Sequence, residues 1–191
     1  MKLVILAGMT VGLLAGSPGS TAAPSGLPQA SHQHFVCHTG YTLEKCRKDI
    51  AVLQRALKKY PVAQLGEWTW VLVRSADWRG IQSPRGLDSN SPAFTYYPGK
   101  ETFLEEALVA EVPRRCSDLQ SAWGMSIEKL LDYAIAHELG HALCNERNEA
   151  KADEAAKLMR EGNAPSCEVN LQEKRRPAED ARKLDKQGIF K

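Results

Sequence analysis

The stretch AHELGHA at residues 136–142, followed by NEAKAD at residues 148–153, decides how this chain is expected to fold. Residues four apart lie on one face of an α-helix, so His137 and His141 would direct two imidazoles toward a single metal ion. Glu138 would place a carboxylate beside them. Two imidazoles and an adjacent carboxylate form the HExxH arrangement, in which zinc is bound and the carboxylate takes a proton from water.

A zinc site of this kind needs a third protein ligand, and Glu149 is the candidate. Along a straight helix, a rise of about 1.5 Å per residue would put the α-carbons of His141 and Glu149 about 12 Å apart, too far for one shared ion. The chain is therefore expected to turn back between them. Asn145 tolerates the left-handed conformation that ends helices, and Asn148 is a favourable N-cap for a second helix that begins at Glu149.

Asp153 lies one turn beyond Glu149 on this second helix. We expect its carboxylate to accept a hydrogen bond from the ring nitrogen of a ligand histidine that faces away from the metal. Carboxylates in this position fix the tautomer of the ligand and raise its basicity.

These segments resemble the gluzincins (glutamate zincins), the class of HExxH zinc metallopeptidases that includes thermolysin, and the resemblance covers about residues 127–160. It implies a Zn²⁺ cofactor, a peptide or protein substrate, and hydrolysis by a zinc-bound water that Glu138 activates. The residue roles that it implies are metal ligation by His137, His141 and Glu149, general base and acid catalysis by Glu138, and a hydrogen bond from His137 to Asp153.

The sequence departs from the thermolysin pattern in two ways. The gap between His141 and Glu149 is much shorter, closer to that of small ImmA/IrrE-like domains, and no histidine or tyrosine follows His141 as a downstream electrophile. Tyr96 or Tyr97 is a candidate oxyanion donor in its place, although tyrosines on strands are more often packing residues.

Apolar periodicity and turn residues predict the remaining elements. They are a helix over 42–60, strands over 68–74, 93–97 and near 102–104, a loop over 80–92, a helix capped by Ser126 that carries the histidines, and a helix over 149–161. Together with the resemblance, they predict a small α+β, zincin-like domain over residues 37–168, with a short mixed or antiparallel sheet. By resemblance, an edge strand lies above the HExxH helix and pairs with extended substrate.

The two ends of the chain differ in composition from this domain. Residues 1–23 read as a signal peptide, with an apolar run too short to span a bilayer and a cleavage site after Ala23. Residues 24–36 are expected to be a disordered linker, and 169–191 a charged, mobile tail. The mature protein is therefore expected to be secreted or periplasmic, with no membrane partner after signal removal.

All five cysteines lie in the exported part, where disulfides can form. We expect Cys37 to pair with Cys46 and Cys144 with Cys167, which leaves Cys116 over. Zinc ligation by these thiols is less favoured, because none has Cys-x-x-Cys spacing.

The formal net charge of +2 is spread along the chain without an aromatic and basic stripe, which argues against a nucleic-acid partner. Two other interpretations remain open for the motif. One is an exported, non-catalytic zinc-binding domain that recognises a partner protein; the other is a structural domain in which the histidines are ordinary helix residues. Substrate specificity and oligomeric state are not readable from the sequence.

Overall fold

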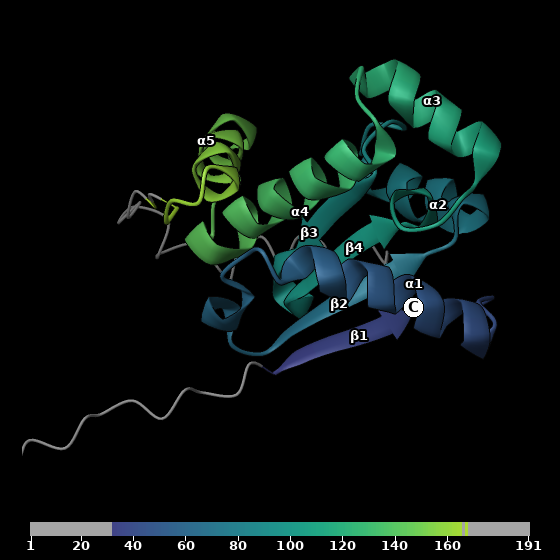
Figure 1. The fold of residues 1–191 in the computed structure, drawn as a ribbon, viewed down its shortest axis with the longest axis horizontal. Coiled ribbons are helices and arrows are strands. Elements are labelled where there is room, and N and C mark those ends of the chain that lie inside the picture. Colours follow the sequence, from purple (N-terminus) through teal and green to yellow (C-terminus); the bar gives the residue numbers. More distant parts are fainter. Residues whose placement is uncertain (1–31, 166, 168–191) are drawn as a thin grey trace, which may run out of the picture.

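The structure is a computed structural model that describes residues 32–165 and Cys167. Within these residues the chain forms an α+β domain of five α-helices and one four-stranded mixed sheet, as predicted (Figure 1). The strands are β1 (Gln33–Cys37), β2 (Trp68–Val73), β3 (Ala93–Tyr96) and β4 (Glu101–Glu105), in the spatial order β1-β2-β4-β3. The first, second and fourth run parallel, whereas β3 is antiparallel to β4 and forms an edge of the sheet.

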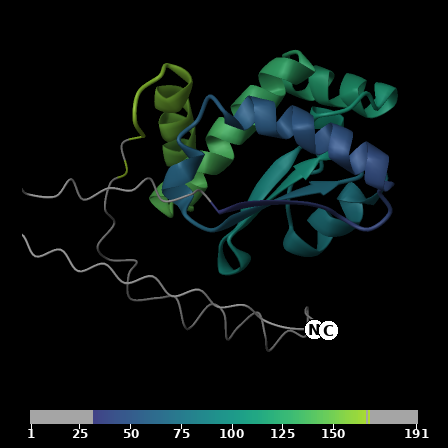
Figure 2. The same cartoon turned by 60° about the horizontal axis from the view of Figure 1, so that its bottom comes forward.

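The helices cover the two faces of this sheet unequally. In Figure 2, α1 (Leu43–Leu57) and α4 (Ile127–Cys144) lie on one face, and the short α2 (Ser75–Gln82) lies on the other. Side chains alternate accordingly along β2: Trp70 and Leu72 join the main core, and Val71 and Val73 join a smaller cluster with Trp78. The face under α1 and α4 is therefore the one that supports the HExxH helix.

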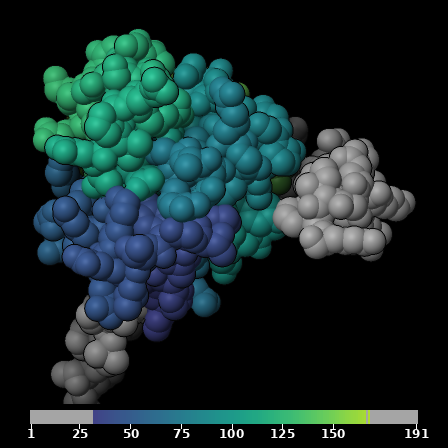
Figure 3. Space-filling view, turned by 90° about the vertical axis from the view of Figure 1, so that its right-hand side faces the viewer, coloured from purple at the N-terminus to yellow at the C-terminus, as the bar shows by residue number. Residues whose placement is uncertain are grey.

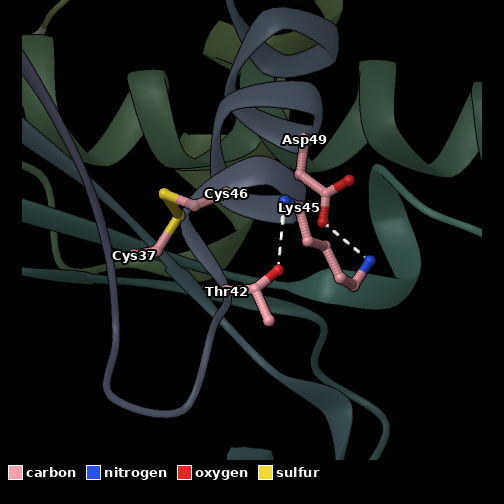
Figure 4. The surroundings of a disulfide bond; sticks show 5 residues. All are labelled: Cys37, Thr42, Lys45, Cys46 and Asp49. Atoms are coloured by element: carbon pink, nitrogen blue, oxygen red, sulfur yellow. Dashed lines mark hydrogen bonds and ion pairs between the residues drawn. A yellow bond between two sulfur atoms is a disulfide. The ribbon is translucent and has the colours of Figure 1, made fainter.

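Helix α1 begins where the sequence indicates, because Thr42 caps it by accepting a hydrogen bond from the Lys45 backbone amide at 3.3 Å (Figure 4). The Cys37–Cys46 disulfide ties its second turn to the end of β1. The second predicted disulfide, Cys144–Cys167, is also present, and Cys116 is free. Two disulfides indicate an oxidising, extracytoplasmic environment.

Two helices were not predicted. Helix α3 (Pro113–Trp123) buries only Leu119, so it lacks the apolar stripe by which a helix is recognised in sequence. Helix α2 enters the segment 80–92 that was expected to be a loop, and a 3-10 turn follows it over Ser83–Arg85. In Figure 3 the green surface of α3 adjoins the teal surface of the α2 region above the blue surface of α1.

The predicted disordered linker over 24–36 is wrong for residues 33–36, which belong to β1. The strand forms because it pairs with β2, and because the Gln33 side chain donates to the Gly66 carbonyl at 2.8 Å and accepts from Trp70 Nε1 at 2.8 Å. None of these partners is close in sequence. The proposed signal peptide and the tail at 169–191 lie outside the described residues. No helix in the described part of the chain is long and apolar enough to span a membrane.

The predicted hairpin of the last two helices is confirmed. Ser126 caps α4, Asn145 ends it at φ 48° and ψ 41°, and Asn148 caps α5 (Glu149–Arg160). The two helices pack so closely that a β-carbon on Gly140 would lie 2.7 Å from the Ala152 carbonyl oxygen. Glycine at this position therefore allows α5 to approach the helix that carries the histidines.

Candidate metal centre

The HExxH residues lie on the half of α4 that follows its apolar anchor. Leu130, Ile135 and Leu139 are fully buried in the main core and fix the rotation of the helix. This rotation directs His137 and His141 toward a cleft lined by α4, α5 and β3, where Glu149 is the first residue of α5.

Three side-chain atoms meet in this cleft. His137 Nε2 lies 3.0 Å from His141 Nε2 and 3.0 Å from Glu149 Oε2, and His141 Nε2 lies 3.5 Å from the same carboxylate oxygen. The structure thus brings together the three residues predicted as ligands, and as a group they can hold a metal ion.

The hydrogen bonds on the far side of each ring support this interpretation. His137 Nδ1 lies 2.7 Å from Asp153 Oδ1, and His141 Nδ1 lies 2.6 Å from the Glu146 carbonyl oxygen. Both partners are acceptors, so each ring can donate from Nδ1 and direct Nε2 toward the other two ligand atoms. With the proton on Nδ1, two imidazole lone pairs and a carboxylate oxygen converge on one point, and this donor set fits a bound metal.

The predicted contact between Asp153 and His137 is present, and Tyr133 adds to it. The Tyr133 hydroxyl donates to the same Asp153 oxygen at 2.5 Å. Burial, and next the hydrogen bond to Asp153, raise the pKa of Tyr133, so its hydroxyl remains a donor. Tyr133 was not predicted as a site residue, although it lies four positions before His137 on the same helix face.

Of the two candidate oxyanion donors, the structure brings Tyr97 to the cleft and not Tyr96. Tyr96 packs against the smaller cluster on the opposite face of the sheet. Tyr97 lines the cleft, but its hydroxyl donates to the Glu146 carbonyl that also accepts from His141. Burial raises the pKa of Tyr97. In this geometry Tyr97 supports the loop that orients His141.

Glu138 is buried at the floor of the cleft, with 4% of its surface exposed. Its Oε2 accepts a hydrogen bond from Thr95 Oγ1 at 2.8 Å. Burial raises the pKa of Glu138 to about 7, against the opposing effects of His141 and of the Thr95 hydrogen bond. Thr95 is a second site residue that was not predicted, because no local pattern in the sequence places β3 beside α4.

The cleft has a volume of about 730 Å³ and extends along α4 beyond the three ligand residues. Its wall opposite α5 comes from β3 and from the residues that precede it, 86–92. Trp123, Tyr133 and Ala134 lie at one end of the cleft, and Tyr97 and Arg147 lie at the other. The volume is sufficient for a ligand much larger than water.

Comparisons with known proteins add no assignment to this geometry. No protein-family model, curated protein or solved structure matches the chain.

Proposed function

We propose that this protein is a secreted zinc-dependent metallopeptidase that hydrolyses peptide bonds, with Glu138 as its general base. The observation that carries the proposal is the convergence of His137 Nε2, His141 Nε2 and Glu149 Oε2 beside a buried carboxylate at the floor of an open cleft. This arrangement combines a metal-binding group, a base and space for a substrate.

Zinc is the metal that suits the donor set best. Two imidazole nitrogens and one carboxylate oxygen form a known ligand set of catalytic zinc sites, which leave a further position open. When bound, zinc would supply Lewis acidity toward a carbonyl group and toward water.

Glu138 has the properties of a group that takes up and returns a proton. Because burial raises its pKa, its protonated form is not strongly disfavoured, and a general base must hold that form transiently. Thr95 binds Oε2, so we assign proton transfer to Oε1. The same carboxyl group would then protonate the leaving amine.

The edge strand β3 is positioned to orient an extended substrate. Strand β3 lies beside α4, because Thr95 on β3 contacts Glu138 on α4 at 2.8 Å. Among the described strands it pairs only with β4, which leaves its second edge without a strand partner. A substrate that adds a strand to this edge would gain affinity from backbone hydrogen bonds, independently of its side chains. Its scissile bond would lie next to Glu138.

The second candidate is a non-catalytic zinc-binding domain that recognises a partner protein. It is favoured by the Tyr97 hydroxyl, which donates to the Glu146 carbonyl and so does not face a bound ligand. In this alternative the same three residues bind zinc and the cleft binds without cutting.

Purified protein separates the two candidates. We expect one zinc per chain by elemental analysis, cleavage of casein or of a peptide library, loss of cleavage with a chelator, and recovery when zinc returns. Glu138→Gln should keep the zinc and lose turnover, whereas Glu128→Gln, on the exposed first turn of the same helix, should keep both. Zinc binding without hydrolysis would favour the non-catalytic domain, and full activity of Glu138→Gln would overturn its assignment as the base.

A further inference from the structure

Two aromatic rings form one end of the cleft. Trp123, at the end of α3, and Tyr133, on α4, have ring centroids 5.6 Å apart, and both side chains are half-buried and line the cleft. The Tyr133 ring lies 5.7 Å from the ring of His137. The aromatic wall is therefore continuous with the metal centre.

The polar atoms of both rings are already paired. Trp123 Nε1 donates to the Asn90 carbonyl at 2.8 Å, and the Tyr133 hydroxyl donates to Asp153. What the rings present to the cleft is therefore apolar surface. Leu87 and Ala134 line the same cleft and add to this surface.

Charged residues of both signs lie around the cleft. Asp88, Glu149 and Asp153 line it together with Arg147, and the Arg160 guanidinium lies 5.9 Å from the centroid of the Tyr133 ring. Charge therefore does not select the ligand at this end, whereas an uncharged apolar group would bury its surface against the two rings.

We propose that Trp123 and Tyr133 form a specificity pocket that accepts an aromatic or bulky aliphatic side chain of the substrate, at a residue adjoining the scissile bond. The inference rests on the proposed peptidase function and adds the class of substrate. Because Tyr133 also contacts Asp153, Trp123 is the residue that tests the pocket without altering the partners of His137.

The first test compares peptides that differ at one residue next to the cleavage site, with phenylalanine, leucine, alanine or glutamate there. We expect phenylalanine or leucine to exceed alanine in kcat/KM by about tenfold or more, since a large apolar side chain differs from alanine by several methylene equivalents. Trp123→Ala should reduce this ratio to less than about threefold, and Trp123→Phe should preserve it. The control Ser121→Ala changes an exposed residue of α3 that does not line the cleft. In this variant the ratio of the kcat/KM values should equal that of the wild type.

The second test does not depend on activity. Metal-free protein is titrated with N-acetyl-phenylalanine amide or with N-acetyl-alanine amide, and the indole N–H resonance of Trp123, identified by its loss in Trp123→Phe, is followed by NMR. We expect a saturable shift with the phenylalanine compound and none with the alanine compound. Leu87→Ala, a change in the loop before β3, should weaken the shift.

If the protein cuts peptides, the side-chain preference tests the pocket. If the ratio of kcat/KM for phenylalanine or leucine over alanine is unchanged in both Trp123→Ala and Leu87→Ala, the proposed specificity pocket is wrong, while the proposed peptidase function is unaffected. Where no peptide is cut, the proposed function fails, and the NMR titration decides the pocket alone. Circular dichroism identifies a Trp123→Ala variant that does not fold, in which case Leu87→Ala gives the result.

Discussion

Thr95 on β3 and Glu138 on α4 are 43 residues apart in sequence, and the Thr95 hydroxyl donates a hydrogen bond of 2.8 Å to the Glu138 carboxylate. The same hydroxyl lies 3.2 Å from Thr102 Oγ1, which accepts from Trp68 Nε1 at 3.0 Å. Because an ionised carboxylate only accepts, Thr95 gives its proton to Glu138, and Thr102 gives its own to Thr95. A buried chain of donors therefore runs from β2 through β4 and β3 to the proposed base.

Thr95→Val tests this chain. A hydrogen bond to a charged group contributes about 1.5–3 kcal/mol, so we expect kcat/KM to fall roughly ten- to a hundredfold. The Thr95 bond lowers the pKa of Glu138, so its loss should move the acidic limb of the pH profile of kcat/KM to higher pH. Thr95→Ser should restore the wild-type profile. A Thr95→Val profile that coincides with the wild type would show that Thr95 does not act on the base.

The ionised Glu138 carboxylate is expected to lower the free energy of unfolding of the metal-free protein. Its pKa in the folded protein is about 7, above the ordinary value of 4.5, so the contribution of Glu138 to stability is most favourable below pH 4.5 and is lost as the pH rises through 7. At pH 8 this loss approaches about 3 kcal/mol. Glu138→Gln should therefore be more stable than the wild type at pH 8 and about equally stable at pH 4.5.

Urea unfolding with a chelator present measures this difference at the two pH values. Glu128→Gln is the control, because Glu128 is exposed on the same helix. A Glu138→Gln variant no more stable than the wild type at pH 8 contradicts the prediction.

Asp153→Asn should weaken zinc binding by roughly ten- to a hundredfold, because the charged acceptor that orients His137 is lost. Glu149→Ala, which removes a proposed ligand, should weaken it further. Competition with a chromophoric chelator measures both affinities. The control is Glu154→Gln, which changes an exposed neighbour on α5 and should bind zinc as tightly as the wild type does. If Asp153→Asn also binds zinc as tightly as the wild type, Asp153 does not contact His137 in solution.

Gly140→Ala should destabilise the protein even though alanine favours a helix by about 1 kcal/mol over glycine. The new β-carbon would lie 2.7 Å from the Ala152 carbonyl oxygen and would push α5 away, with an expected cost of about 1–3 kcal/mol. Zinc affinity should fall as well, since α5 carries Glu149.

Gly80→Ala is the matched control, because Gly80 also lies in a helix but its β-carbon would meet no atom within 4 Å. Thermal unfolding should show Gly80→Ala at or above the wild-type Tm. If Gly140→Ala also unfolds at or above the wild-type Tm, the close approach of α4 and α5 does not require glycine at residue 140.

The residues that were predicted correctly are those whose partners are close in sequence. Thr42, Ser126 and Asn148 cap helices by accepting a backbone N–H three residues ahead, and Asn145 adopts the left-handed conformation by itself. For the same reason, the four-residue spacing of His137 and His141 placed both on one helix face. The turn between α4 and α5 then brought Glu149 to the pair.

The tertiary structure alone decided the features that depend on distant partners. Residues 33–36 were expected to be disordered because they end a Pro-, Ser- and Gln-rich segment, and they are ordered by the pairing of β1 with β2, more than thirty residues away. Likewise, Thr95 reaches Glu138 only because the sheet order places β3 at the edge beside α4. Trp123 reaches Tyr133 because α3 packs against α4. Helix caps and helix faces are local and can be read along the chain, whereas the surroundings of the proposed base and the wall of the cleft arise from packing between elements, which no local pattern encodes.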